Sequence, residues 1–214
     1  MNSDKYKIIF KNYEKIAKEE SQDVRRVGWN NAQRAEARYQ FILDQLKTIV
    51  VESDTNHVNL LDIGCGLCIL YGHIKSSPYC RVNYQGIDIS EYYISQSTRI
   101  YPEINLLCCD ILVDAQGLII KADITVLNGV FTQRFDLDQA EMDEFLINMI
   151  LEAKKCTKKL ILFNVMSPYV DFRLEGSYHV EYERMIEMMG QVGITNVEFD
   201  ENVVPYEYFV RAYV

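Results

Sequence analysis

The sequence feature that most limits the fold is an apolar run, Val58–Ile63, followed at once by the turn Gly64-Cys65-Gly66. A second apolar stretch begins at Leu67. A short apolar run that ends at a glycine turn indicates a buried strand, and the stretch after it indicates a helix. In an open α/β sheet, a strand, a turn and a helix in this order form the place where a nucleotide-like ligand binds.

A carboxylate beside the turn narrows the choice of ligand. Gly64 and Gly66 permit backbone angles and a close ligand approach that a side chain would prevent, and the helix start offers free N–H groups. Asp62, at the end of the strand, would repel a pyrophosphate but attract an ammonium or sulfonium group. The dinucleotide fingerprint also requires a glycine three residues after Gly66, where this chain has Ile69. Both observations disfavour a nicotinamide-dependent oxidoreductase.

Two further aspartates follow the next two predicted strands. Asp88 ends a strand predicted over 83–88, and Asp110 comes just after one predicted over 104–108. The carboxyl ends of neighbouring parallel strands share one edge of a sheet, so we expect Asp62, Asp88 and Asp110 to lie along a single rim. A carboxylate at the position of Asp88 can accept hydrogen bonds from ribose hydroxyls.

This pattern resembles the first motif of the class I S-adenosylmethionine-dependent methyltransferases, which is an acidic residue, any residue, Gly, any residue, Gly, any residue and usually Gly. Asp62, Gly64 and Gly66 match, and Cys68 stands at the third glycine, which implies slightly less room in the turn. The resemblance implies S-adenosyl-L-methionine as cofactor, S-adenosyl-L-homocysteine as product, and a three-layer, Rossmann-like α/β fold. Its seven-stranded sheet would have the order 3-2-1-4-5-7-6, with the last strand antiparallel and a helical cap before the first strand.

Apolar spacing sets the expected organisation of the chain. A length of 214 residues fits a single domain with a full core. Helical spacing over about 4–20 and 32–50 predicts two helices before the first strand, and we expect both to cap the ligand edge. Residues 1–56 are thus predicted as cap and linker, and residues 57–214 as the cofactor-binding core. Runs at 194–199 and 207–213 predict a terminal antiparallel hairpin.

The resemblance also assigns cofactor contacts. It implies that Asp110 hydrogen-bonds the adenine amino group and that Ile111 lines the ring. Besides the aspartates and glycines named above, the predicted binding residues are Cys65, Ile89, Ile111, Asn128, Gly129, Arg38, Trp29 and Tyr13. The segment from Trp29 to Tyr39 resembles the cap of small bacterial methyltransferases. By that resemblance, Arg38 grips the methionyl carboxylate while Tyr13 and Trp29 close over it; a solvated helix-surface arginine is the alternative.

Methyl transfer from a sulfonium is an in-line displacement, in which the protein aligns the acceptor and removes water. A general base helps when the acceptor is a hydroxyl or a protonated amine. Of the histidines, His179 follows a strand predicted over 159–166, at the expected ligand edge and beside Tyr178. We therefore predict His179 and Tyr178 as catalytic residues, with a helix-start cap as the alternative for His179.

Charge and cysteine usage exclude several classes. The net charge is −9, and no basic face is visible, which argues against a nucleic-acid partner. No apolar stretch is long enough to span a membrane, and the N-terminus lacks a signal peptide, so we expect a cytoplasmic monomer or homodimer. The six cysteines are Cys65, Cys68, Cys80, Cys108, Cys109 and Cys156. No second pair accompanies the CxxC spacing of Cys65 and Cys68, so all are predicted as buried thiols, without a metal or disulfide.

The leading hypothesis is a methyltransferase that acts on an oxygen atom of a small molecule. A sugar or a phosphorylated surface-glycan precursor is the acceptor suggested by analogy. The alternative is a non-catalytic cofactor-binding partner that stabilises a related enzyme, because the third glycine is missing and the base is not identified.

Overall fold

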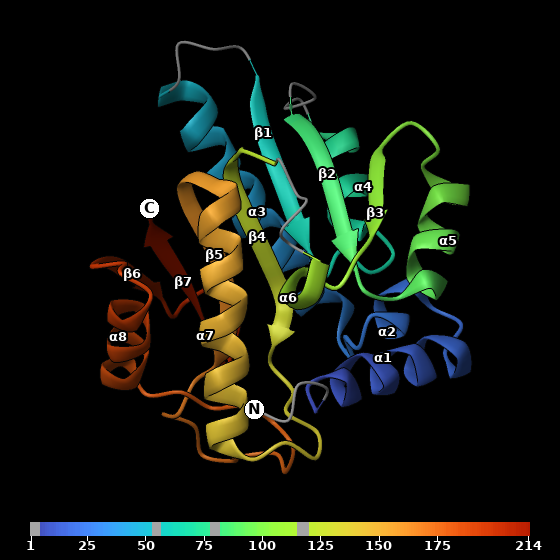
Figure 1. Ribbon diagram of the computed structural model, residues 1–214. Coiled ribbons are helices and arrows are strands. Elements are labelled where there is room, and N and C mark those ends of the chain that lie inside the picture. Colours follow the sequence, from blue (N-terminus) through green and yellow to red (C-terminus); the bar gives the residue numbers. More distant parts are fainter. Residues whose placement is uncertain (1–4, 53–56, 78–81, 115–119) are drawn as a thin grey trace.

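The computed structural model describes residues 5–52, 57–77, 82–114 and 120–214. Its centre is a seven-stranded sheet of order β3-β2-β1-β4-β5-β7-β6 (Figure 1). The strands are β1 (Val58–Ile63), β2 (Val82–Asp88), β3 (Asn105–Cys108), β4 (Ala122–Phe131), β5 (Thr157–Met166), β6 (Asn196–Asp200) and β7 (Glu207–Tyr213). β1 to β5 pair in parallel, whereas β7 is antiparallel to both β5 and β6. The predicted fold class, strand order and antiparallel last strand are confirmed.

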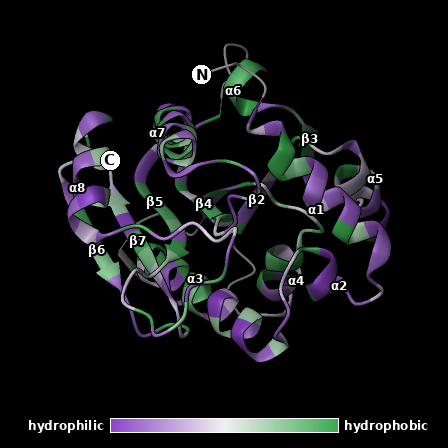
Figure 2. Ribbon diagram, turned by 90° about the horizontal axis from the view of Figure 1, so that it is seen from below, coloured by the Kyte–Doolittle hydropathy of each residue, from purple (hydrophilic) through white to green (hydrophobic). Residues whose placement is uncertain are grey.

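Helices cover both faces of this sheet. They are α1 (Lys7–Glu19), α2 (Asp23–Arg26), α3 (Ala32–Glu52), α4 (Ile69–Ser76), α5 (Glu91–Ile100), α6 (Ile111–Asp114), α7 (Gln139–Cys156) and α8 (Tyr182–Gln191). Viewed from the carboxyl ends of the strands, α7 and α8 lie on one side of the sheet and α3 and α4 on the other (Figure 2). Each side has its own buried apolar cluster, so the protein has the expected three layers.

The helix α3 corrects the prediction that both N-terminal helices cap the ligand edge. Its residues Ile42 and Leu46 are fully buried and pack with strand residues such as Leu60 on one face of the sheet. Instead, α1 and the short helix α2 lie across the carboxyl ends of the strands (Figure 1). The sequence pattern did not predict α2. We call α1, α2 and residues 27–31 the cap. The helix α3 packs on the sheet and does not cap it because its 21 residues can bury one continuous face against the strands.

The strand β4 has an irregular end, which extends to Phe131. Its register with β5 shifts between Leu127 and Phe131, and Gly129 lies inside this shift with a φ of +84°. The N–H group of Gly129 donates to Oδ1 of Asn164 on β5 at 2.7 Å, so a side chain replaces a ladder bond there. This irregular end of β4 brings Asn128 and Gly129 to the rim of the sheet.

The cysteines are mostly placed as predicted. Cys65, Cys68, Cys109 and Cys156 are buried, whereas Cys108 is exposed because β3 is an edge strand of the sheet. Cys80 and the predicted linker at 53–56 lie outside the described residues. Within the described ranges, no group of three His, Cys, Asp or Glu side chains is placed to hold a metal ion, and no helix is long and apolar enough to cross a membrane.

Candidate functional site

A cavity opens at the carboxyl ends of β1, β2 and β4, between these strands and the cap. The space between its walls, measured out to the open mouth, is about 1020 Å³. The predicted cofactor residues that line it are Tyr13, Trp29, Asp62, Gly64, Cys65, Gly66, Asp88, Ile89, Asp110, Ile111, Asn128 and Gly129. The structure therefore brings together every predicted binding residue except Arg38.

The glycine turn after β1 is fixed by the neighbouring strand. The N–H groups of Gly64 and Cys65 both donate to the carbonyl oxygen of Ile87, at 2.8 and 3.1 Å. Gly64 has a φ of +74°, and a Cβ atom there would lie 2.8 Å from a methyl group of Val130. Only glycine fits this position without strain, and its bare backbone forms part of the cavity wall.

The missing third glycine has a structural explanation. Cys68 has a φ of 54°, so it adopts the left-handed conformation that a glycine would favour, just before α4 begins. Its side chain is fully buried. A hydrogen bond with Cys68 and burial raise the pKa of the Cys65 thiol well above its ordinary value, so Cys65 is an inert, neutral part of the wall.

Asp62 is the most deeply placed carboxylate of the cavity. It is 4% exposed, and its Oδ2 accepts a hydrogen bond from the hydroxyl of Tyr84 at 2.7 Å. Burial, together with the nearby charge of Asp88, raises the pKa of Asp62 to about 7, although the hydrogen bond from Tyr84 opposes the shift. A cationic ligand would relieve this cost by pairing with the ionised form.

Asp88 is held by the backbone of its own surroundings. One oxygen accepts from the N–H of Gly66 at 2.8 Å, and the other accepts from the N–H of Ser90 at 2.9 Å. Burial raises the pKa of Asp88 to about 6, although these two hydrogen bonds oppose the shift. Each carboxylate oxygen has a second lone pair, so both can still accept a bond from a ligand.

Asp110 is anchored from the cap. Its Oδ2 accepts from the hydroxyl of Tyr6 at 2.6 Å, and its Oδ1 accepts from the N–H of Leu112 at 3.1 Å. The three predicted aspartates thus line one cavity along one edge of the sheet. We call Asp62, Asp88, Asp110 and their turns the strand rim.

Two features show which ligand chemistry the cavity suits. In the part of the chain that the structure describes, no Lys, Arg or His side chain lines it, and Lys7, which pairs with Asp110 at 4.0 Å, lies outside the lining. The side-chain oxygen of Asn128 is buried and has no hydrogen-bond partner among the described residues. An unpaired buried acceptor is costly, and a ligand that carries an N–H or O–H group would satisfy it.

Comparisons with known proteins identify the fold. The sequence matches no family model and no protein of curated function. The structure is similar to magnesium protoporphyrin IX methyltransferase (ChlM) from Synechocystis PCC 6803 with bound SAH, with 14% sequence identity, coverage of 98% of this chain and 96% of that chain, and a TM-score of 0.62. A S-adenosylmethionine-dependent methyltransferase from Clostridium acetobutylicum ATCC 824 is similar at 11% identity, 98% coverage of both chains and a TM-score of 0.62.

The CurJ carbon methyltransferase is also similar, with 12% identity, 99% coverage of this chain, 70% coverage of that chain and a TM-score of 0.62. The chain has the methyltransferase fold. At these identities the comparisons establish the architecture, whereas the chemistry depends on the side chains that line the cavity.

The cap closes over the methyltransferase-fold cavity through a few side-chain contacts. The hydroxyl of Tyr13 donates to the carbonyl of Gly129 at 3.4 Å. The hydroxyl of Tyr93 lies 3.1 Å from the carbonyl of Tyr13 and 2.6 Å from that of Arg26, so it joins α1 to α2. Trp29 packs so closely on Gly129 that a Cβ atom there would lie 2.6 Å from the indole ring.

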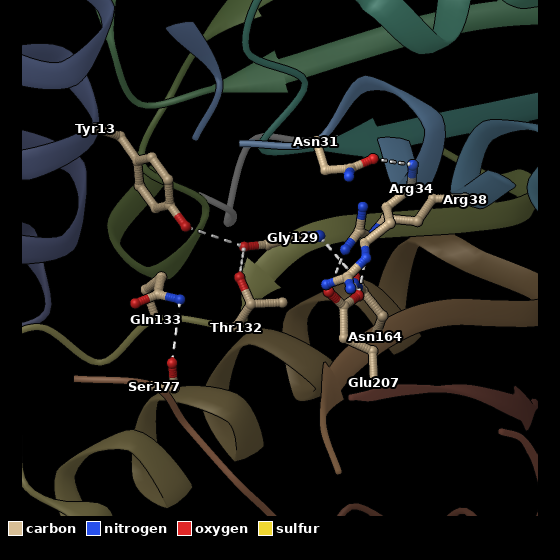
Figure 3. A network of polar contacts seen from close by, with 10 residues as sticks. All are labelled: Tyr13, Asn31, Arg34, Arg38, Gly129, Thr132, Gln133, Asn164, Ser177 and Glu207. Carbon is tan, nitrogen blue, oxygen red and sulfur yellow. Dashed lines mark hydrogen bonds and ion pairs between the residues drawn. The ribbon is translucent and has the colours of Figure 1, made fainter. Parts of the chain in front are cut away.

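Arg38 does not take the predicted position at the cofactor's carboxylate. It is 4% exposed, and its Nε donates to Oε2 of Glu207 at 2.9 Å while its Nη2 pairs with the other oxygen. Its guanidinium group lies on the Trp29 ring, 3.9 Å from the centroid. Figure 3 shows this network, in which the donors of Arg38 face Glu207. The prediction is corrected: Arg38 does not line the cavity, and the Nε–Nη2 edge that would pair side-on with a ligand's carboxylate is already occupied by Glu207.

The two predicted catalytic residues also lie outside the cavity lining. Tyr178 is fully buried, and its hydroxyl donates to Asp143 on α7, which together with burial raises its pKa above the ordinary value. The Nδ1 atom of His179 lies 2.6 Å from the carbonyl oxygen of Ser167 and must carry the hydrogen, because a carbonyl only accepts. Its Nε2 is buried and has no partner among the described residues. The structure therefore does not support Tyr178 as a catalytic group and leaves His179 at a distance from the wall.

Several lining residues were not predicted as site residues. Tyr39 lines the cavity from α3 and stacks on His73 with ring centroids 4.7 Å apart. Ser90 and Tyr93 line it from the start of α5, and Ser90 also caps that helix. A serine just before a helical apolar pattern is a recognisable N-cap signal, but nothing in the spacing of Tyr39 or Tyr93 separates them from ordinary core tyrosines.

Proposed function

We propose that this protein binds S-adenosylmethionine in the cavity and transfers its methyl group to a small molecule. The observation that carries the proposal is the charge of the cavity: three aspartates on the strand rim and no basic side chain in the described lining. Such a wall favours a ligand with positive charge and disfavours a pyrophosphate. This same feature argues against a nicotinamide dinucleotide.

The remaining wall fits the same cofactor. The bare backbone at Gly64 and Gly66 allows the close approach that a bulky nucleoside needs. The unpaired oxygen of Asn128 offers an acceptor for an ammonium or amino group. Apolar side chains from both the strands and the cap surround the polar groups, as in most sites for small organic ligands. This combination of polar and apolar contacts supports the proposal.

Each rim residue would then have one role. Asp62 would face the positive charge of the methionyl part, Asp88 would accept bonds from the ribose hydroxyls, and Asp110 would accept one from the adenine amino group. Ile89 and Ile111 would pack on the adenine ring. When bound, the cofactor supplies a methyl group that its sulfonium already activates, so the chain has to align the acceptor and exclude water.

For the acceptor we propose a hydroxyl group of a small molecule, so that the reaction is an O-methylation. A sugar or a phosphorylated surface-glycan precursor is the class that the sequence resemblance suggested. Within that class the cation-free lining favours an unphosphorylated sugar, since a phosphate next to three carboxylates would need a basic partner. A screen of matched sugars and sugar phosphates tests this choice.

A non-catalytic role is the second candidate, and one observation favours it. Neither Tyr178 nor His179 lines the cavity, and the described lining contains no His or Lys and no carboxylate besides those of the strand rim. In this role, the protein would bind the cofactor and stabilise a related enzyme. Methyl transfer by the purified chain alone would exclude it.

Isothermal titration calorimetry tests the function most directly. The proposal expects S-adenosylhomocysteine to bind with a 1:1 stoichiometry and NAD not to bind. Mass spectrometry of acceptor mixtures incubated with S-adenosylmethionine and the purified protein then separates the enzyme from the non-catalytic partner. The absence of S-adenosylhomocysteine binding would overturn the proposal as a whole.

A further inference from the structure

A closed ring of contacts connects the cap to the C-terminal hairpin. Arg38 stacks on Trp29 and pairs with Glu207, whose Oε2 also accepts from Nδ2 of Asn164 at 2.8 Å. Asn164 in turn accepts from the N–H of Gly129 at 2.7 Å. Gly129 is the residue on which the Trp29 ring rests. Trp29 and Gly129, which pack against each other in the cavity wall, are thus both linked to the carboxylate of Glu207. Figure 3 shows the part of this ring that runs from Arg38 through Glu207 and Asn164 to Gly129.

We infer that Glu207 is a positioning residue that holds Trp29 over the cofactor cavity through Arg38, and holds Gly129 beneath it through Asn164. The inference deepens the proposed function, because the cavity in question is the one assigned to the cofactor. Glu207 itself does not line the cavity. It acts on two residues that do.

The buried ion pair of Arg38 and Glu207 contributes orientation more than stability. Arg38 is 4% and Glu207 6% exposed, so both charges have lost nearly all their water. A buried ion pair often stabilises a protein no better than apolar side chains of the same volume. What it adds is orientation. The two-point pairing with Glu207 fixes the plane of the Arg38 guanidinium, and the face of that plane lies on the Trp29 ring.

Trp29 needs such a support. It lies in the short segment between α2 and α3, is half-buried, and lines the cavity. Its backbone N–H donates to the carbonyl of Val24 at 3.0 Å, which holds the main chain but does not fix the indole ring. The Trp29 side chain also has a hydrogen bond with the hydroxyl of Tyr39, which holds one edge of the ring. The Arg38 stack on one side and the bare backbone of Gly129 on the other give the ring one position.

Trp29 is the only tryptophan of the chain, so its fluorescence reports this position without any ligand. In Glu207→Gln the volume is kept but Arg38 loses its counter-charge. We expect stronger acrylamide quenching of Trp29 and about tenfold weaker binding of S-adenosylhomocysteine, with unchanged circular dichroism. The matched control is Glu198→Gln, which breaks the ion pair of Glu198 with Arg211 on the same hairpin at 2.9 Å and should change neither reading.

A second variant keeps the test decisive if Glu207→Gln does not fold. The double substitution Arg38→Met and Glu207→Met removes both charges, which buried sites often tolerate. It should fold and still expose Trp29 to quenching. If quenching and affinity in a folded variant equal those of the parent, the inference is wrong. If S-adenosylhomocysteine binds no form of the protein, the proposed function fails, but quenching without ligand still decides the role of Glu207.

Discussion

The strand rim and the cap line the same cavity, but different kinds of contact fix them. On the rim, Asp88 is held by the backbone N–H groups of Gly66 and Ser90, and Asp110 by that of Leu112. These donors lie just after β1, β2 and β3, and Leu112 is already in α6. Backbone donors are present whatever the side chain, so these two carboxylates are held as soon as the sheet and its turns form. Asp62 is the exception, because its partner is the hydroxyl of Tyr84 on the neighbouring strand β2.

The cap is held by side chains from distant parts of the chain. Tyr6 reaches Asp110, Tyr13 reaches Gly129, and Trp29 depends on Arg38. Every one of these contacts can be removed by a single substitution, and none is part of a sheet or helix ladder. A wall held by a few side-chain contacts can open locally at low cost, whereas the rim cannot move without the sheet. If the proposed function is correct, the rim recognises the ligand and the cap controls its access to the cavity.

The largest expected effect is on the rim, from Gly64→Val. The new side chain would meet Val130, and the positive φ would be strained. We expect binding of S-adenosylhomocysteine to be lost without global unfolding, because the clash is confined to the turn. Calorimetry and thermal unfolding check both points. Gly190→Val is the control, since nothing lies within 4 Å of a Cβ at this exposed glycine. Retained affinity in Gly64→Val would mean that the turn is not a cofactor wall.

A smaller loss is expected for Asp88→Ala. It removes the acceptor proposed for the ribose and leaves the N–H groups of Gly66 and Ser90 without a partner. We expect binding to weaken by about 1–3 kcal/mol, as for the loss of charge-assisted hydrogen bonds. Asp123→Ala is the matched control, since Asp123 also accepts a backbone N–H, from Asn59 at 2.9 Å, but at the opposite end of the sheet. If the two variants bind S-adenosylhomocysteine with equal affinity, the ribose does not contact Asp88.

The rim could be predicted from the sequence because its geometry is local. A strand that ends in Asp62 and continues into a glycine turn has few ways to fold, and parallel pairing then aligns Asp88 and Asp110 on the same edge. Cys68 departs from the motif in sequence, and only the structure shows that its backbone adopts the left-handed conformation that a glycine would take at this position.

The cap could not be predicted in the same way. The partner of Arg38 is Glu207, which lies 169 positions further along the chain, and no spacing rule connects the two. Tyr178 shows the same limit: it is adjacent to the ligand edge in sequence, but its side chain turns toward Asp143 on α7. Contacts between distant side chains depend on how the layers pack, which an apolar pattern does not specify.

The pH dependence of binding sharpens the comparison, because the rim carries titratable groups. The pKa of Asp62 is about 7 and that of Asp88 about 6 in the ligand-free protein. A cationic ligand binds the ionised form, so affinity is full above pH 7 and falls as the pH drops through these values. Between pH 8 and pH 6, we expect a loss of about tenfold from Asp62. Calorimetry with S-adenosylmethionine measures it.

Asp62→Asn is the control for this titration. It should bind weakly at all pH values and lose the part of the slope near pH 7. If the slope persists unchanged in this variant, Asp62 does not face the charge of the ligand, and the electrostatic argument for the cofactor loses its main support.

The smallest effect is expected in the cap, from Tyr6→Phe. The substitution removes the hydroxyl that donates to Asp110 at 2.6 Å and keeps the ring, which stacks on Phe145 with centroids 5.7 Å apart. One hydrogen bond contributes about 0.5–1.5 kcal/mol. Since it acts on the ligand only through Asp110, we expect affinity for S-adenosylhomocysteine to fall about threefold. Hydrogen exchange of α1 should become faster, because a tie between cap and rim is lost.

Tyr208→Phe provides the matched control for Tyr6→Phe. It deletes a buried hydroxyl that donates to the carbonyl of Val180 at 3.0 Å, far along the chain from the cap. It should lower the melting temperature without changing affinity or exchange in α1. If Tyr6→Phe leaves exchange in α1 unchanged while affinity falls, the cap does not depend on this side chain. The loss of affinity would then come from a change at Asp110 alone, and the contrast between a rim held mainly by backbone donors and a cap held by side chains would not apply to Tyr6.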